Sequence, residues 1–359
     1  MDEINILPLR LESQLLMLHQ ASTVQEVVSR MGALQAQDYE MMKWAIGCRL
    51  PNSTATLVEE ALNNGEILRT HVLRPTWHVV SAKDIHWMLA LTAPRIRNSM
   101  KVRDAQLGLT ASTILKSKSI LVKALEGGLH KTKEELNLLL NNASIPTTGY
   151  RDAHYLMHAE LDGLICNGKN IGKIRTYALL DERAPSKHDL SKEESLATLA
   201  RMYFTGRCPA SMQDFMWWSG LTTGDARLAI DSVKAHFHSE KIGLQTFILP
   251  NLTPSTNPSV NLVHPIPAFD DFIIAYKDRS AVLIPEKFQK VVSSNGVFRP
   301  ALLLNGKVIG IWKRTTKKNK LLIEITLFDR KFREFDPAFR ESFANYGRFY
   351  GIKIDVCYS

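Results

Sequence analysis

Before about residue 250, apolar positions recur mostly at the three-to-four-residue spacing of amphipathic helices, whereas short β-rich runs follow that point. Strands are expected at 272–276, 281–284, 301–304, 308–312 and 321–328. The Pro-rich segment 249–267 lies between the two regions and marks a boundary. The pattern predicts an α+β fold with a β-rich C-terminal part.

The first 250 residues repeat one plan, most clearly over 111–187. A helix at 114–125 ends at Gly127-Gly128, and Thr132 with Glu135 forms a capping-box pattern that opens a second helix. A third helix is expected at 150–164, followed by two short strands that meet at Asn167-Gly168. Three helices followed by a β-ribbon are typical of a winged helix, a variant of the helix-turn-helix.

Two further copies of this plan are expected, at 188–250 and, less regularly, at 1–110. The later copy has helices that start near Lys192, Ser211 and Thr222, and KIGLQTFIL supplies its wing. Three winged-helix units and a β-rich domain at 251–359 account for the length of 359 residues.

Two hairpins are expected in the C-terminal domain. Asn305-Gly306 between ALLL and KVIGIW is a two-residue turn signal. A second hairpin joins KVIGIWKR to LLIEITLF through TTKKNK, so its tip is cationic.

The chain carries a net charge of +9, which favours a polyanionic partner. Residues 287–323 contain nine cations and no acid, and a second acid-free basic run covers 85–103. A single run of this kind is usually a solvated face, but two in one chain favour contact with a phosphate backbone. No apolar run is long enough to span a membrane, and the first residues lack a signal pattern, so a cytoplasmic protein is expected.

The sequence lacks the motifs that mark several common kinds of metal, redox, nucleotide and hydrolase site. The four cysteines stand singly, without a CxxC pair, and no GxGxxG, Walker A or GxSxG motif occurs. His154 and His158 share a helix face, but no third ligand is evident, so we expect neither a metal nor a cofactor.

Gln35-Ala36-Gln37 separates two predicted helices. In an extended turn, side chains two residues apart point the same way, so both amides could converge on one ligand. The alternative is a polar linker in which Asp38 caps the next helix.

A second dense polar segment, RTHVLRPTWHVVS, contains Arg69, His71, Arg74 and His78. These side chains could meet DNA phosphates. The alternative is a polar-faced strand with alternate residues buried.

At these two segments the chain resembles the AlkZ-type DNA glycosylases of the AlkZ/YcaQ-like winged-helix family. AELDGLICNGK, PAFDDFIIAYKDR and SNGVFRPALLLNGKVIGIWKR extend the resemblance over nearly the whole chain. It implies three tandem winged helices in a C shape followed by a C-terminal β-barrel. Gln35-Ala36-Gln37 matches the signature of the AlkZ branch, whereas the YcaQ branch has Asp at the third position.

The resemblance implies a monofunctional DNA N-glycosylase that excises cationic N-alkylated purines and could unhook interstrand crosslinks. Gln35 and Gln37 would be its catalytic residues, and duplex DNA its partner, bound by a monomer without a membrane or an obligate protein partner. We expect DNA contacts from the polar segment RTHVLRPTWHVVS, through Arg69, His71, Arg74 and His78, and from the cationic hairpin, through Lys313, Arg314, Lys317 and Lys318. Within the cell it would associate with the nucleoid. A non-catalytic winged-helix regulator is the alternative, although regulators usually dimerise around one recognition helix.

Overall fold

The computed structural model describes residues 5–17, 21–251 and 261–359. Its chain forms two compact units: unit 1 comprises Met1–Glu59 and Leu196–Ser359, and unit 2 comprises Glu60–Ser195. Helix α4 (Ala55–Asn64) leads from unit 1 into unit 2, and α10 (Lys192–Arg207) leads back. Residues 252–260, within the predicted Pro-rich boundary, lie outside the described residues.

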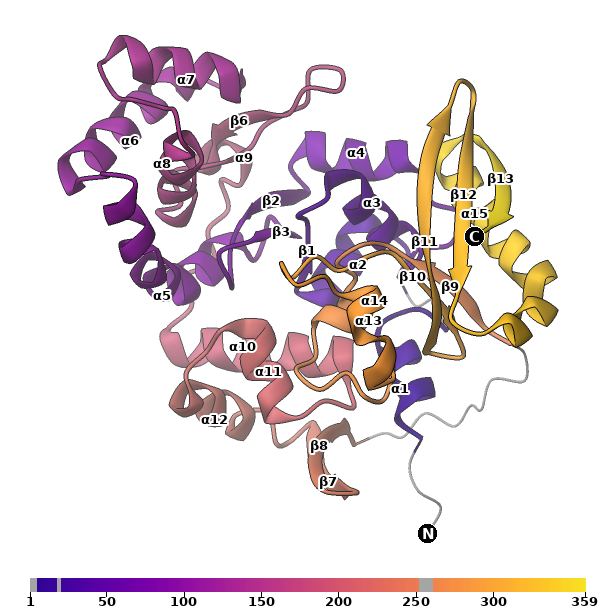
Figure 1. The fold of residues 1–359 in the computed structure, drawn as a ribbon. Coiled ribbons are helices and arrows are strands. Elements are labelled where there is room, and N and C mark those ends of the chain that lie inside the picture. Colours follow the sequence, from indigo (N-terminus) through magenta and orange to yellow (C-terminus); the bar gives the residue numbers. More distant parts are fainter. Residues whose placement is uncertain (1–4, 18–20, 252–260) are drawn as a thin grey trace. The chain divides into compact units, whose positions relative to one another are not determined.

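In unit 2, the end of α4 is followed by a β-hairpin and then by helices and a small sheet (Figure 1). The hairpin pairs β2 (Ile67–His71) with β3 (Trp77–Ser81) in antiparallel register. The later elements are α5 (Ile85–Gln106), α6 (Ala111–Leu125), β4 (Lys131–Thr132), α7 (Lys133–Asn142), α8 (Arg151–Leu161), β5 (Ile165–Asn167), β6 (Thr176–Leu179) and α9 (Leu180–Arg183).

The segment 111–187 has the predicted order of three helices and a ribbon, but residues 168–175 separate the two ribbon strands, which therefore do not meet at Asn167-Gly168 as expected. The capping box at α7 is confirmed, because Thr132 Oγ1 accepts from Glu135 N while a Glu135 carboxylate oxygen accepts from Thr132 N. Leu121, Leu140 and Tyr155 from the three helices meet in one core. The strand order β4-β6-β5 closes this core with a three-stranded sheet. The number of winged-helix units in the chain stays a prediction.

Unit 1 contains Gln35 and Gln37, at and after the end of its first strand. Elements of this unit are α1 (Ile6–Ser13), α2 (Val24–Met31), β1 (Ala33–Gln35), α3 (Tyr39–Gly47), α11 (Met212–Ser219), α12 (Thr223–Asp231) and the hairpin of β7 (Phe237–Ile242) with β8 (Gln245–Pro250). Helix α2 ends at Gly32, whose φ of 66° lies in the region that favours glycine. The end of α2 also approaches α10 closely, since a Cβ on Gly206 would lie 2.9 Å from the Arg30 carbonyl oxygen.

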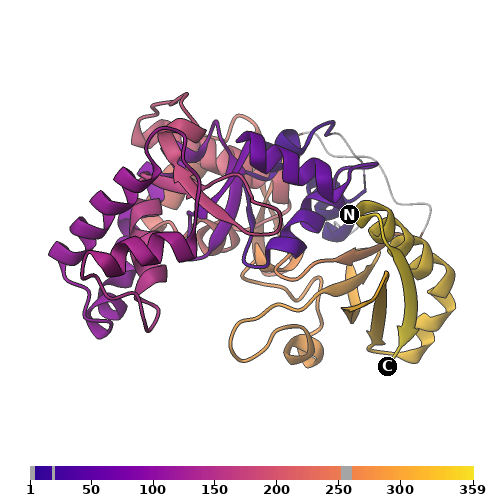
Figure 2. The same ribbon diagram turned by 90° about the horizontal axis from the view of Figure 1, so that it is seen from above.

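The C-terminal part of unit 1 is a five-stranded sheet in the order β13-β12-β11-β10-β9. Its strands are β9 (Val263–Ile266), β10 (Ala301–Leu304), β11 (Lys307–Lys317), β12 (Lys320–Leu327) and β13 (Lys353–Tyr358). Helix α15 (Asp336–Tyr350) packs against β9 and β13 (Figures 1 and 2). Leu7 and Leu11 of α1 join the core beneath this sheet. Closure of the sheet into a barrel stays a prediction.

Both predicted hairpins are present. Asn305 and Gly306 have φ values of 49° and 80°, as a type I′ turn requires. The second hairpin is tighter than expected: Lys317 pairs with Lys320, so only Lys318 and Asn319 form the turn.

Two of the five expected C-terminal strands are wrong. Residues 272–276 fall mostly within the short helix α13 (Asp271–Ile274), and 281–284 form turns. The apolar run FIIAY is buried on all sides, and such a run does not distinguish strand from helix. Asp270 favours the helix at this point, because its side chain accepts a hydrogen bond from Phe272 N and caps the helix.

None of the helices in the described ranges combines the length and the apolar character needed to cross a membrane.

Candidate functional site

Residues 35–37, here called the glutamine turn, connect the end of β1 to the start of α3 in unit 1. Gln35 and Ala36 are buried, whereas Gln37 is exposed. The two amides therefore differ in their access to solvent, although they are separated by a single residue. An exposed amide can meet a macromolecular substrate directly, and a buried amide is held by its surroundings.

Asp38 caps the helix that follows the turn. Its Oδ1 accepts a hydrogen bond from Met41 N at 3.0 Å, and its carbonyl oxygen accepts from Met42 N at 2.8 Å. The capping role expected from the sequence is thus confirmed. The cap fixes where α3 starts and so where the glutamine turn ends.

The start of α3 is tied to the C-terminal helix α15. Tyr350 Oη donates to the Glu40 carbonyl oxygen at 2.6 Å, in the first turn of α3. Trp44, one turn further along, packs edge-on against Tyr346 with ring centroids 5.0 Å apart. Its indole N–H donates to the Pro265 carbonyl oxygen at 2.6 Å. Residues from the C-terminal third of the chain therefore hold this helix, which lies near its N-terminal end.

Arg314 connects the same tyrosines to β11. Its Nη1 donates to Tyr346 Oη at 2.8 Å, and its guanidinium carbon lies 5.7 Å from the centroid of the Tyr350 ring. Burial lowers the pKa of Arg314, but the two tyrosines and Asp38 outweigh this, so the pKa lies above its ordinary value. Arg314 is thus held as a cation near the start of α3.

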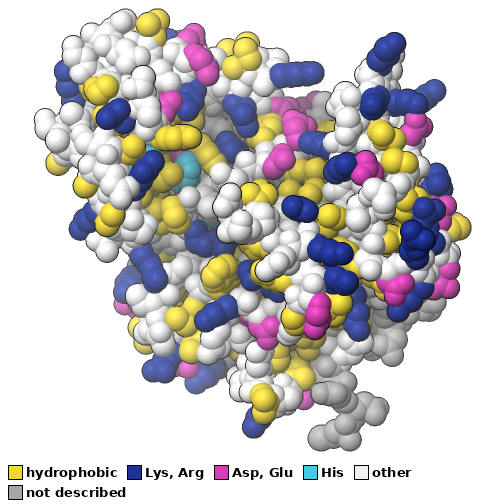
Figure 3. Space-filling model, in the orientation of Figure 1, with side chains coloured by type: hydrophobic (Ala, Val, Ile, Leu, Met, Phe, Trp, Pro, Cys, Tyr) yellow, Lys and Arg dark blue, Asp and Glu magenta, His cyan; other side chains and the backbone are white. Residues whose placement is uncertain are grey.

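Strands β11 and β12 form a hairpin, here called the basic hairpin. Residues 310–317 of β11 pair with β12, whereas β10 pairs only with 307–311, so the far half of β11 has no partner on its other edge among the described strands. Figure 3 shows Lys and Arg side chains at the free end of the hairpin.

The cations of the basic hairpin have different environments. Lys313 Nζ pairs with Glu324 Oε1 at 2.8 Å, and Lys320 pairs with Asp355. Lys317 and Lys318 are exposed and form no ion pair with any described residue. Of the predicted contacts on this hairpin, Lys317 and Lys318 are therefore the most accessible to a phosphate.

The four predicted contacts from the polar segment 69–81 lie in unit 2, and three of them are buried. The Arg69 guanidinium carbon lies 3.9 Å from the centroid of the Trp77 ring, and His71 Nδ1 pairs with the fully buried Glu160. His78 Nδ1 lies 2.9 Å from the carbonyl oxygen of its near neighbour Thr76.

Arg74 is partly buried, and every residue of β2 is buried, which differs from the alternating burial expected of a half-exposed strand. The DNA contacts of Arg69, His71, Arg74 and His78 stay a prediction.

His154 and His158 both interact with the carboxylate of Asp104. His154 Nδ1 lies 2.7 Å from Asp104 Oδ1, and His158 Nε2 lies 2.9 Å from Asp104 Oδ2. In the part of the chain that the structure describes, no group of three or more His, Cys, Asp or Glu residues is placed to hold a metal ion.

The tyrosines of α15, Glu160 and a buried pair of aspartates, Asp270 and Asp271, were not among the expected site residues. The aspartates carried one local signal, because two adjacent acids within the apolar run AFDDFIIAY need partners if they are buried.

A protein-family model described as "DNA glycosylase AlkZ-like" matches residues 28–349. Among solved structures, the Streptomyces sahachiroi DNA glycosylase AlkZ is similar in fold, with a TM-score of 0.80 and 18% sequence identity over 99% of this chain and 98% of that one. A comparison with curated proteins gives no match.

Proposed function

The chain belongs to the AlkZ-like DNA glycosylase family, and from this premise we propose that it excises cationic N-alkylated purines from duplex DNA by means of Gln35 and Gln37. As a family member it is a DNA N-glycosylase, a hydrolase of N-glycosyl bonds, and DNA is its partner. The observation that carries the proposal is the glutamine turn itself. It presents the exposed Gln37 beside the buried Gln35 at the start of a capped helix.

The chemistry of the lesion explains why amides would suffice. Alkylation at N7 or N3 makes a purine cationic and therefore a good leaving group, so the base needs little acid catalysis. Breaking the glycosidic bond develops positive charge on the sugar, as in glycoside hydrolysis. A preorganised amide carbonyl directed at that charge stabilises the transition state.

The two glutamines would also handle the attacking water. An amide has an acceptor and two donors, so it can orient a water molecule without titrating. We assign the positioning of water to the exposed Gln37 and contact with the sugar or water to the buried Gln35. Because an amide is a poor general base, this design favours activated lesions such as N7-alkylguanine and N3-alkyladenine over intact purines.

The basic hairpin would supply affinity for the duplex. Many enzymes that act on a base flip it out of the helix at a cost of a few kcal/mol, which a bulky or crosslinked lesion resists. A cationic hairpin that reaches a groove or the phosphates beside the lesion would allow excision without full flipping, including the unhooking of crosslinks. Lys317 and Lys318 are the residues best exposed for this contact.

We also propose a division of the chain into domains. We assign winged helices to 1–110, 111–187 and 188–250 and a barrel to 251–359, with a monomer as the working form. The helices and ribbons in each segment support this division.

One gel tests the activity. Purified protein is incubated with duplexes that carry N7-methylguanine, N3-methyladenine or an N7–N7 crosslink, and abasic sites are revealed by alkali. Strand breaks at the lesion support a glycosylase for that lesion. Binding without breaks on any of the duplexes would contradict the proposed substrate class and favour a non-catalytic binder.

The glutamines are tested by substitution. Gln37→Ala should lower the single-turnover rate of N7-methylguanine excision by roughly 10²-fold, the scale of losing one preorganised polar group. Affinity for an abasic-site duplex should change little, because phosphate contacts dominate affinity. Parental excision rates for both Gln35→Ala and Gln37→Ala would contradict the catalytic assignment. If the segment were only a linker, the substitutions would lower the melting temperature at most slightly.

A further inference from the structure

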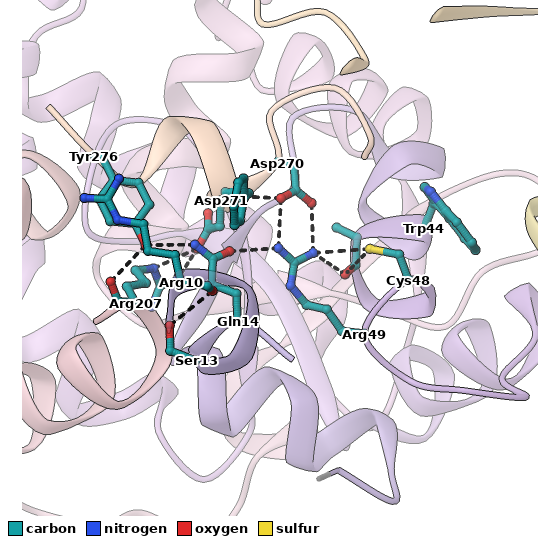
Figure 4. A network of polar contacts seen from close by, with 12 residues as sticks. Arg10, Ser13, Gln14, Trp44, Cys48, Arg49, Arg207, Asp270, Asp271 and Tyr276 are labelled. Atoms are coloured by element: carbon teal, nitrogen blue, oxygen red, sulfur yellow. Dashed lines mark hydrogen bonds and ion pairs between the residues drawn. The ribbon is translucent and has the colours of Figure 1, made fainter. Parts of the chain in front are cut away.

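Asp270 and Asp271 are adjacent, buried acids that each pair with a different buried arginine (Figure 4). Asp270 pairs with Arg49, which follows the C-terminal end of α3, and Asp271 pairs with Arg207, the last residue of α10. All four side chains are at most 2% exposed. We call these four residues the aspartate clamp.

The first arm of the aspartate clamp reaches the strand that precedes the glutamine turn. Arg207 donates to Asp271 Oδ2 through Nε at 3.1 Å and through Nη2 as well. The same Nη2 donates to the carbonyl oxygen of Ala33 at 2.9 Å. Ala33 is the first residue of β1 and lies two positions before Gln35.

The position of Arg207 is itself fixed. Its guanidinium carbon lies 4.4 Å from the centroid of the Trp218 ring, and its carbonyl oxygen accepts from Tyr276 Oη at 2.9 Å. The first arm therefore holds β1 from a rigid support.

The second arm reaches the helix that follows the turn. Arg49 makes a bidentate pair with Asp270, with both N···O distances 2.8 Å. Arg49 Nη1 also donates to the Ala45 carbonyl oxygen in the last turns of α3 at 2.8 Å, and Nη2 donates to Gln14 Oε1 at 3.0 Å. Burial lowers the pKa of Arg49, but Asp270 more than offsets this, so the pKa of Arg49 lies above its ordinary range and the guanidinium stays charged.

We propose that Asp270 and Asp271 are positioning residues, which fix both flanks of the glutamine turn through Arg207, which bonds to β1, and through Arg49, which bonds to α3. The proposal rests on the proposed catalytic role of Gln35 and Gln37. A planar guanidinium that bonds a carboxylate and a backbone carbonyl at once fixes direction as well as distance. Displacement of a catalytic group by about 1 Å can cost roughly 10²-fold in rate, so such fixation bears on chemistry.

Arg207→Lys is the most direct test of the first arm. A lysine keeps the charge, but its single ammonium cannot replace two donors on Asp271 together with one on Ala33. Single-turnover excision of N7-methylguanine should fall about 10-fold or more, while the Kd for an abasic-site duplex stays within twofold. Arg183→Lys is the matched control, because Arg183 is a half-buried arginine of unit 2 that donates to the backbone carbonyls of Asn63 and Leu62, outside both β1 and α3. Its excision rate should stay within twofold at a comparable decrease in melting temperature.

A double-mutant comparison separates positioning from general loss of structure. If Arg207 acts through the glutamine turn, Arg207→Lys should slow a Gln37→Ala protein by less than threefold, since the group it positions is gone. The same factor in both backgrounds would overturn the proposal, as would parental excision by Arg207→Lys. If Arg207→Lys does not fold, Asp271→Asn keeps the shape of the side chain and provides the same comparison. Parental excision by Gln37→Ala would overturn the proposed function and the aspartate clamp with it, whereas slow Gln37→Ala beside parental Arg207→Lys would overturn the clamp alone.

Discussion

Asp38 directly follows Gln37, where a carboxylate could also serve as a general base, but its Oδ1 is engaged by Met41 N. Asparagine caps a helix about as well as aspartate and cannot act as a base. We expect Asp38→Asn to leave N7-methylguanine excision within threefold of the parent and the melting temperature nearly unchanged. The measurement is single-turnover excision together with a thermal melt. A 10²-fold decrease in rate in a variant that melts normally would make Asp38 the base.

His158 should make the folding stability of the protein depend on pH. Burial lowers its pKa, and the ion pair with Asp104 opposes this only in part. The unfolded chain, with a histidine pKa of about 6.5, therefore takes up this proton before the folded chain does. His158 should make the protein less stable as pH falls below about 6.5, and the decrease should level off once the folded state is protonated too.

Thermal melts at pH 7.5 and pH 5.5 check this expectation. His158→Gln keeps a hydrogen-bonding group beside Asp104 but does not titrate. The melting temperature of the parent should fall further between the two pH values than that of His158→Gln. An equal decrease in both proteins would show that another group carries the pH dependence.

At the scale of elements, one part of the basic hairpin packs against the rest of unit 1 and its tip is exposed. Arg314 is held by the tyrosines of α15, whereas Lys317 and Lys318 extend beyond the strand pairing of β10. Changing Lys317 and Lys318 together to Ala should weaken duplex binding. The slope of log K against the logarithm of the salt concentration should also become shallower, by about one for each phosphate that a lysine no longer neutralises.

The matched control for the hairpin is Lys234→Ala with Lys331→Ala, which changes the net charge equally at surface lysines that pair with Asp231 and Asp329. Titrations of a duplex at several salt concentrations compare the two double variants. An unchanged salt slope for the hairpin variant would show that the hairpin does not touch DNA.

Local patterns predicted the elements whose signals are local. The capping box of α7, the Asn305-Gly306 turn and the cap at Asp38 depend on residues within three positions of each other. The strand expected at 272–276 was wrong because its burial comes from distant packing, which a continuous apolar run does not reveal.

For the whole molecule, the family and the α+β character followed from motifs spread along the chain, and the match over residues 28–349 confirms the family. The support of the glutamine turn could not be predicted in the same way. Arg49 and Asp270 are 221 residues apart, and Arg207 and Asp271 are 64 apart. No local period relates such positions, so the pairs emerge only from the folded chain.

The proposed reaction should not require a metal ion. A cationic purine leaves readily and the glutamines need no Lewis acid, while His154 and His158 are both engaged by Asp104. Excision should therefore stay within about twofold of the parental rate after dialysis against EDTA, as the alkali gel measures. Stoichiometric zinc in the purified protein, together with excision that disappears on its removal, would contradict this.

The discontinuity of unit 1 has a consequence during synthesis on the ribosome. Gln35 and Gln37 are made early, but Asp270 is added 221 residues after its partner Arg49. A nascent or prematurely terminated chain that stops before residue 270 thus has the two proposed catalytic amides without the acids proposed to fix their turn. If excision needs the aspartate clamp, base removal, which leaves an abasic site in the DNA, would be withheld until residue 271 of the 359 has been added.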